Sequence, residues 1–318
     1  MVTSLFKPNV IAHRGASGYL PEHTLEAKIV AHWQGADYLE QDVVATGDGE
    51  LIVFHDINLE SITDVATLYP DRQREDGHYY AVDFLLSEIR TLAVSQRNDQ
   101  ANDLSPNFTA MLPELSERFA ISTLAEEIDL IQELNRLTGR SVGIYPELKN
   151  PAWHRDHGID LARSLFDILS AAGYNEATDA IFVQCFDPSE IRRLREELGT
   201  RVRLVQLVYD DENYSNLLEL DGLRELAEFA QGLGPGFEQL VDTGVDGAVK
   251  PSPLFQLARD NGLELHPYTF RRRNLPAYAE SLEALLSVFF RDIPVDAVFC
   301  DYPDVAVRVR DSVLGLRR

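Results

Sequence analysis

The sequence predicts a single TIM (β/α)8 barrel that carries a small inserted subdomain. Eight short apolar runs recur along the 318 residues, and stretches of helical periodicity separate them. The runs are almost continuously hydrophobic, which is typical of parallel strands covered on both faces. An open doubly wound sheet is the competing architecture, but the glycine-rich fingerprint that it needs after the first strand is absent. We therefore expect one barrel domain over residues 1–318.

The predicted strands alternate with helices eight times, and this alternation favours a closed parallel barrel. In chain order the strands are Val10–His13, Tyr38–Ala45, Val142–Glu147, Ala180–Phe186, Arg203–Val208, Phe229–Leu233, Leu263–Pro267 and Val295–Cys300.

Helix start signals occur between these strands. Leu25–Trp33 has helical character, and Thr123 followed by Glu126 is typical of a capping box. Asp187 precedes Pro188, which suits a helix that begins with proline in its first turn. Three more helices are predicted over Leu223–Ala230, Leu254–Asn261 and Leu282–Phe289.

The alternation stops between Asn58 and Phe119. This segment is polar, contains Pro70, Pro106 and Pro113, and far exceeds the roughly 2–6 residues of a usual βα loop. We expect residues 58–119 to form an insertion on the carboxyl-terminal face of the barrel, where the active sites of this fold lie.

Charge and hydropathy limit the partners and the location of the protein. The chain has 29 basic and 52 acidic residues, a net charge of −23, so a nucleic acid or an anionic membrane surface is not an expected partner. No apolar run approaches the ~18 residues of a membrane span. The first residues do not resemble a signal peptide, which predicts a cytoplasmic protein, or a periplasmic or secreted one if an export signal has been removed. The sequence does not indicate the oligomeric state.

Two residue types are rare in the chain. Cys185 and Cys300 fall on the fourth and eighth predicted strands, which face each other across a barrel, so we expect two free thiols. Only four lysines accompany 25 arginines, so a lysine at a strand end is notable. Lys250, His266 and Trp153 are each candidates either for substrate contact or for a purely structural role.

Charged side chains cluster at the ends of the first two strands. His13 ends the first strand and Arg14 follows it, where the catalytic groups of a barrel lie. Glu40 and Asp42 lie two residues apart on the second strand and share one face. Two carboxylates in an apolar strand need a cation between them; hard divalent cations such as Mg²⁺ or Ca²⁺ fit, and an arginine is the alternative.

A hairpin is predicted to bring a second histidine to this site. If Gly47–Glu50 forms a four-residue loop, Thr46 lies opposite Leu51 and His55 lies opposite Asp42. Opposed residues hold their Cβ atoms ~5 Å apart, so His55 would lie beside the carboxylates.

The third barrel strand adds Glu147 and Lys149 on one face. A third carboxylate completes a plausible oxygen shell for a divalent cation, and the lysine can balance an anion. Two histidines, three carboxylates, an arginine and a lysine thus converge from neighbouring strand ends, a set that indicates metal-assisted cleavage of a phosphoester.

Several segments closely resemble the glycerophosphodiester phosphodiesterase family, in particular its bacterial periplasmic-type branch. The matching segments are Ile11–Ala27, Ala36–Val43, Phe54–Asp56, Gly143–Lys149, Gln184–Asp187, His266–Arg271 and Asp301–Asp304. The resemblance implies a TIM-type barrel with a small inserted subdomain. It also implies metal ligands at Glu40, Asp42 and Glu147, acid–base histidines at His13 and His55, and substrate contacts from Arg14, Lys149 and Gln184. His23 stands where much of the wider family has asparagine.

The expected activity is the metal-dependent hydrolysis of glycerophosphodiesters to sn-glycerol 3-phosphate and an alcohol. Two alternatives remain: a related barrel phospholipase that acts on lysophospholipids, and a barrel that binds a phosphodiester without cleaving it. The sequence does not indicate the preferred head group, the native metal, or which histidine is acid and which is base.

Overall fold

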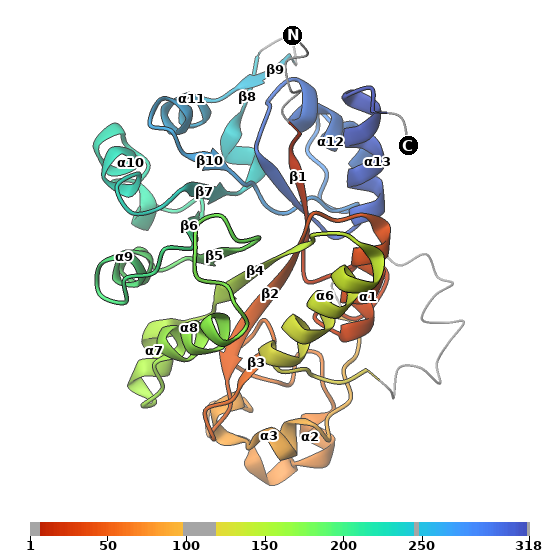
Figure 1. Cartoon of the computed structure of the whole chain (residues 1–318), viewed down its shortest axis with the longest axis vertical. Helices are drawn as coiled ribbons and strands as arrows, with labels where there is room; N and C mark the ends of the chain where they lie inside the picture. The colour runs from red at the N-terminus through yellow and green to blue at the C-terminus, as the bar shows by residue number, and fades with distance from the viewer. Residues whose placement is uncertain (1–6, 98–118, 245–247, 317–318) are drawn as a thin grey trace.

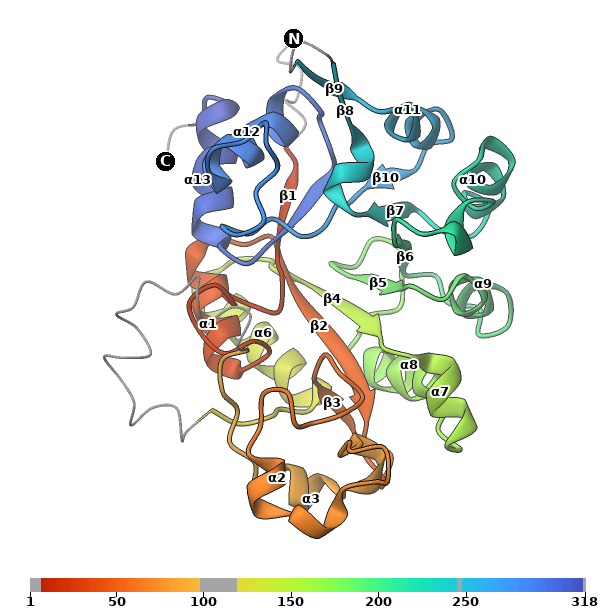
Figure 2. The same cartoon turned by 180° about the vertical axis from the view of Figure 1, so that it is seen from behind.

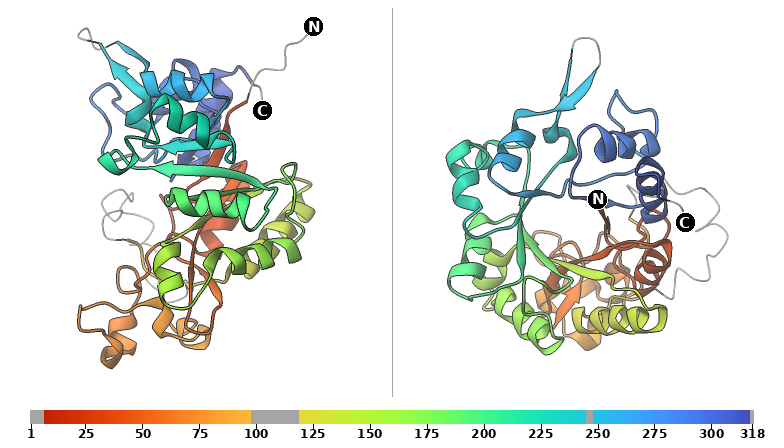
Figure 3. Two further views of the ribbon diagram at one scale, coloured as in Figure 1. Left: turned by 90° about the vertical axis from the view of Figure 1, so that its left-hand side faces the viewer. Right: turned by 45° about the horizontal axis from the view of Figure 1, so that its top comes forward.

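The computed structural model describes residues 7–97, 119–244 and 248–316. Eight parallel strands form the barrel in the order β10-β7-β6-β5-β4-β2-β1-β11, and the helices surround them (Figures 1 and 3). Their bounds are β1 Asn9–Ala12, β2 Tyr38–Ala45, β4 Gly143–Leu148, β5 Phe182–Cys185, β6 Arg203–Val208, β7 Gly232–Pro235, β10 Glu264–Leu265 and β11 Ala297–Cys300. Each lies at a predicted strand, so the predicted barrel is confirmed.

The barrel closes between its seventh and eighth strands. Beyond β10, the backbone N–H of Phe270 donates to Phe299 O at 2.8 Å, and the N–H of Asp301 donates to Phe270 O at 3.2 Å. The N–H of Phe299 likewise donates to Pro267 O at 3.1 Å. These bonds bring residues after Leu265 alongside β11, and β11 pairs with β1, so the barrel closes.

Helix bounds follow the predicted start signals. Thr123 caps α6 in a capping box with Glu126, and the Asp187 side chain caps α9, which begins at Pro188. The longer helices are α1 Leu25–Gln34, α6 Leu124–Thr138, α7 Pro151–Asp156, α8 Leu161–Ala171, α9 Pro188–Glu196, α10 Leu220–Leu226, α11 Pro253–Asp260, α12 Leu282–Arg291 and α13 Pro303–Val313. Among these, α10 begins and ends earlier than predicted, and α7, α8 and α13 were not predicted.

The β2–β3 hairpin differs from the prediction by one residue. In the structure β3 (Leu51–Val53) places Leu51 opposite Ala45 rather than Thr46. The loop is shorter because Thr46 N–H already donates to Glu50 O at 3.0 Å, and Gly49 adopts a φ of 82° that closes a three-residue turn. His55 is therefore not paired with Asp42; it lies beyond the end of β3, where strand alternation no longer fixes its direction.

The described part of the predicted insertion has its own apolar core. Short helices α2 (Val65–Leu68) and α3 (Leu86–Ile89) lie beyond the β2–β3 hairpin at one end of the molecule (Figure 2). Their apolar side chains pack with Phe54 and Phe84 in a cluster separate from that of the barrel. Residues 98–118, with Pro106 and Pro113, lie outside the described residues.

Two further predictions concern the whole chain. Cys185 and Cys300 are both buried free thiols, as predicted. Among the helices of the described ranges, none is long and apolar enough to span a lipid bilayer.

Candidate active site

All eight predicted site residues line one cavity of about 180 Å³ at the carboxyl ends of the barrel strands. These residues are His13, Arg14, Glu40, Asp42, His55, Glu147, Lys149 and Gln184. Parallel strands end at the same rim, so side chains that are distant in the sequence converge there. Phe186, Tyr209, Tyr268 and Arg271 complete much of the wall.

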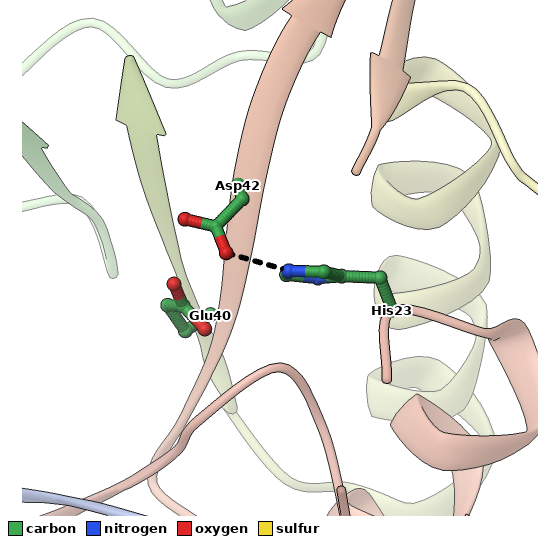
Figure 4. A group of neighbouring side chains, drawn as sticks. All are labelled: His23, Glu40 and Asp42. Carbon is green, nitrogen blue, oxygen red and sulfur yellow. Dashed lines mark hydrogen bonds and ion pairs between the residues drawn. The ribbon is translucent and has the colours of Figure 1, made fainter. Parts of the chain in front are cut away.

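Three buried carboxylates form the floor of this cavity. Glu40 and Asp42 share a face of β2, and Glu147 on β4 is the register partner of Asp42. His23 joins the group, because its Nε2 lies 2.7 Å from Asp42 Oδ2 (Figure 4). Ligand atoms of His23, Glu40 and Asp42 all lie within 4.8 Å of one another, which is close enough to hold one metal ion.

The donor set fits a hard divalent cation. Asp42 Oδ1 is buried and accepts no hydrogen bond from a described donor. Burial and the nearby Asp42 carboxylate hold the pKa of Glu40 well above its usual range. Burial raises the pKa of Glu147 to about 7; the charge of Lys149 acts to lower this pKa, and the charge of Asp42 acts to raise it. Carboxylates that repel one another in this way, with an oxygen that accepts no hydrogen bond, suit a hard divalent cation.

The hydrogen bonds of His23 decide how it fits this group. Lys28 Nζ lies 3.5 Å from His23 Nδ1, so Nδ1 is the acceptor and Nε2–H donates to Asp42. A ring nitrogen that donates a proton has no lone pair for a metal. The hydrogen bond from His23 therefore suits the orientation of Asp42, and Glu147 offers a third carboxylate in the same cavity.

Two positively charged side chains, those of Arg14 and Lys149, lie beside the carboxylates. The backbone N–H of Arg14 donates to Glu40 Oε2 at 2.5 Å, and its guanidinium donates to Glu22 Oε1 at 2.9 Å. Lys149 Nζ lies 2.6 Å from Glu147 Oε1 and 3.6 Å from Asp42 Oδ1. Both side chains line the cavity, where a phosphate could bind between them.

Each histidine of the cavity has a carboxylate at its Nδ1 atom. His13 Nδ1 lies 2.6 Å from Asp301 Oδ1, and His55 Nδ1 lies 2.5 Å from Asp56 Oδ1. A charged carboxylate accepts a hydrogen bond from Nδ1–H, so the ring proton stays on Nδ1 and Nε2 of each ring keeps its lone pair. Burial, followed by the charge of Arg14, lowers the pKa of His13 to about 4, and burial also lowers the pKa of His55. Both rings are therefore neutral near pH 7 and able to accept a proton.

Sequence reasoning did not find the residues that hold the site residues in place. Glu22 binds Arg14 and also pairs with Arg97 of the insertion at 2.8 Å, while Asp301 binds His13. The Asp301–Asp304 segment had been matched to the family, but no spacing rule links Asp301 to a histidine 288 residues earlier.

Two other candidates lie outside the cavity. Lys250 is exposed and pairs with Asp242 across the hairpin of β8 (Val241–Thr243) and β9 (Val249–Pro251). His266 is buried in the barrel, where its Nδ1 lies 2.7 Å from the Tyr145 hydroxyl.

The sequence is similar to that of known phosphodiesterases over most of its length. The model of the "Glycerophosphoryl diester phosphodiesterase family" matches residues 13–305. The glycerophosphodiester phosphodiesterase of Haemophilus influenzae is 38% identical over 325 residues, which cover 94% of this chain and 88% of the relative.

Solved structures share the barrel. A Silicibacter pomeroyi protein described as a glycerophosphoryl diester phosphodiesterase has a TM-score of 0.69 at 21% identity, covering 98% of this chain and 95% of the other. An Oleispira antarctica phosphodiesterase, solved in complex with the product sn-glycerol-3-phosphate, has a TM-score of 0.65 at 21% identity, with 96% and 98% covered. At these identities the structural likeness establishes the fold alone.

Proposed function

The chain belongs to the glycerophosphoryl diester phosphodiesterase family, and from this premise we infer that it hydrolyses glycerophosphodiesters to sn-glycerol 3-phosphate and an alcohol. The observation that carries the proposal is the single cavity in which three buried carboxylates, two cationic side chains and two neutral histidines meet. Because such diesters are what remains of phospholipids after their acyl chains are removed, we propose a role in glycerol and lipid metabolism.

We propose that Glu40, Asp42 and Glu147 hold one divalent cation, Ca²⁺ or Mg²⁺. When bound, this ion supplies positive charge to the phosphoryl oxygens. The unbonded Asp42 Oδ1 and the raised pKa values of Glu40 and Glu147 support the assignment.

The remaining residues bind and orient the diester. A phosphodiester carries one negative charge, and more charge develops on its oxygens as the nucleophile attacks phosphorus. Arg14 and Lys149 supply fixed positive charge for that change, and Gln184 lies within reach at the cavity wall. Glu22 and Glu147 keep the two cations in position.

Proton transfer is assigned to His13 and His55. Water is a weak nucleophile and an alkoxide is a poor leaving group, so one base and one acid are needed. Both rings have an Nε2 lone pair because Asp301 and Asp56 accept hydrogen bonds from the Nδ1–H groups. One ring takes the proton of the nucleophile. The other ring must first take up a proton from solvent at Nε2, and it then gives that proton to the departing alcohol.

The test is the release of glycerol 3-phosphate from glycerophosphocholine, with and without a chelator. We expect turnover that chelation abolishes and that Ca²⁺ or Mg²⁺ restores. His13→Gln and His55→Gln should each lower kcat by about 10²–10⁴-fold. His78→Gln, an exposed histidine paired with Glu60, is the matched control.

Three results would contradict the proposal. Failure to cleave any glycerophosphodiester with any divalent cation would leave a binding protein. Faster cleavage of lysophosphatidylcholine than of glycerophosphocholine would favour a phospholipase. Full activity of His13→Gln would remove that histidine from the reaction.

A further inference from the structure

A second and larger cavity adjoins the first. Its volume is about 680 Å³, against about 180 Å³ for the cavity that holds the carboxylates. The two cavities share His55, Glu147, Lys149, Phe186 and Tyr209. A substrate whose phosphate lies at Lys149 can therefore extend into the second cavity, and His55 stands at the junction.

Aromatic rings form much of the wall of this second cavity. Phe186 and Tyr209 stack with ring centroids 4.0 Å apart and planes 8° apart, and Tyr209 is half exposed. Trp153 on α7 stacks on Tyr80 of the insertion, with centroids 5.3 Å apart. Tyr214 also lines the cavity. Ring faces carry partial negative charge, which favours a cation over an anion. Trp153 already packs against Tyr80 and His157, so the half-exposed Tyr209 is the ring best placed to contact a ligand.

The charged groups of this cavity also favour a cation over an anion. Three acidic residues line it, Asp56, Glu147 and Asp187, of which Glu147 belongs to the proposed cation site; Lys149 is the one lysine or arginine among its described lining residues. Lys149 is committed to Glu147 and Asp42. Asp56 pairs with Arg97, but Asp187 forms no ion pair with a described residue.

Asp187 is well placed to act on a ligand. It is only partly buried and follows Phe186 directly at the end of β5. Its Oδ1 accepts hydrogen bonds from Ser189 N at 2.9 Å and Ser189 Oγ at 2.6 Å, which fixes the carboxylate at the start of α9. A fixed negative charge beside stacked rings is the arrangement that recognises an ammonium group.

We propose that the second cavity is a head-group subsite that selects a cationic alcohol, with a primary or quaternary ammonium group, over neutral and anionic alcohols. The inference rests on the proposed function, because it assumes that a glycerophosphodiester binds across both cavities. The glycerol 3-phosphate part then occupies the smaller cavity, and the ammonium group lies against Tyr209 and Asp187. A polyol could stack on the same rings, but it gains nothing from the carboxylates, and an anionic head group is repelled by them.

The test uses a matched pair of substrates, glycerophosphocholine and its neutral carbon isostere, the 3,3-dimethylbutyl ester. The two have the same shape and differ in one charge. We expect kcat/KM to be about 10-fold or more higher for the choline ester, with a ratio that falls as salt is added.

Variants connect that ratio to named residues. Asp187→Asn keeps the helix cap because asparagine caps as well as aspartate, yet it removes the charge. It should lower the choline-to-isostere ratio several-fold, and Tyr209→Leu should lower it as well. Asp179→Asn is the control: Asp179 is also partly buried and accepts backbone hydrogen bonds, from Asn175 N at 2.7 Å and Glu176 N at 2.8 Å, but it lines neither cavity. Its ratio should equal that of the wild type.

A binding experiment separates this inference from the proposed function. Calorimetry with choline alone should show binding that Asp187→Asn weakens, and 3,3-dimethylbutanol should bind less tightly. Equal kcat/KM for the two esters, or equal binding of choline and its isostere, overturns the head-group subsite while hydrolysis stands. If neither ester is cleaved, the proposed function fails, and the choline titration still decides whether the cavity selects a cation.

Discussion

At the scale of single residues, the site depends on groups that hold the cavity residues in place. Asp301 Oδ1 accepts a hydrogen bond from His13 Nδ1 at 2.6 Å, and Arg271 Nε lies 3.2 Å from Asp301 Oδ2. With the Nδ1 proton held there, the lone pair of His13 is at Nε2. We therefore regard Asp301 as a positioning residue for proton transfer.

Replacing Asp301 with asparagine should disable this arrangement without removing the side chain. An asparagine amide can donate to Nδ1, which would place the ring proton on Nε2, where it blocks the role of base. We expect kcat to fall by about 10²–10⁴-fold with KM nearly unchanged. Asp304→Asn, which alters the carboxylate bonded to the Tyr19 hydroxyl, is the control. A purely structural role for Asp301 would instead change KM and thermal stability together.

The lowered pKa of His13 gives a pH dependence that can be isolated by mutation. Burial lowers this pKa from 6.5 to about 4, so the unfolded chain binds a proton between these values that the folded protein does not. Stability should therefore fall as pH decreases from about 6.5 to 4, by up to roughly 1.4 kcal/mol per pH unit for this group. Denaturant titrations at pH 7 and 5 should show a larger loss for the wild type than for His13→Gln. Equal losses would show that His13 is not buried as a neutral ring.

The eight site residues could be predicted because strand ends converge in any parallel barrel. Glu40 and Asp42 were recognised by their spacing, and Lys149 stood out among only four lysines. Asp301 and Glu22 could not be assigned their roles, since their contacts depend on barrel closure and on the path of the loop after β1. Neither leaves a periodic signal in the sequence.

At the scale of elements, a buried ion pair connects two helices beneath the site. Lys28 on α1 and Glu127 on α6 are fully buried, with Nζ 3.2 Å from Oε2. Lys28 also donates to the backbone oxygen of Glu40, and it lies beside His23. The pair therefore joins α1, α6 and β2 below the carboxylates.

Removing one partner of this pair should be more harmful than removing both. Lys28→Met leaves a buried carboxylate without a counter-charge, which should lower the free energy of unfolding by about 3–5 kcal/mol. The double variant Lys28→Met with Glu127→Leu should be clearly more stable than the single one. Arg136→Met, which breaks an exposed pair with Glu133, should change stability by less than about 1 kcal/mol. A single variant as stable as the wild type would mean that water reaches the pair.

The element boundaries show where sequence patterns are sufficient. The cap of α6 was predicted because Thr123 and Glu126 form a local motif. The hairpin register was wrong because it depends on whether the loop has three or four residues, and the φ of Gly49 decides this. The paired β2 and β3 were still recognised, since their apolar residues are consecutive.

At the scale of the whole molecule, the fold brings like charges together at one end of the barrel. Glu40, Asp42 and Glu147 come from two adjacent strands whose positions are set by the barrel core, so they cannot move apart. Burial and the proximity of Asp42 raise the pKa values of Glu40 and Glu147, so both hold a proton to a higher pH than an ordinary glutamic acid does. The barrel thus holds a site whose repulsion is relieved by either protons or a divalent cation.

Divalent cations should therefore stabilise the whole barrel, and more so at high pH. A ligand that binds only the folded state at 100 times its Kd adds about 2.7 kcal/mol, which should raise Tm by several degrees. The pKa of Glu147 is about 7, so at pH 8 this carboxylate is mostly ionised, whereas at pH 5.5 a proton competes with the cation. We expect Ca²⁺ or Mg²⁺ to raise Tm in thermal melts at pH 8, to raise it less at pH 5.5, and to leave Asp42→Asn almost unchanged. A Tm that does not respond to any divalent cation at pH 8 would contradict a cation site built from these three carboxylates.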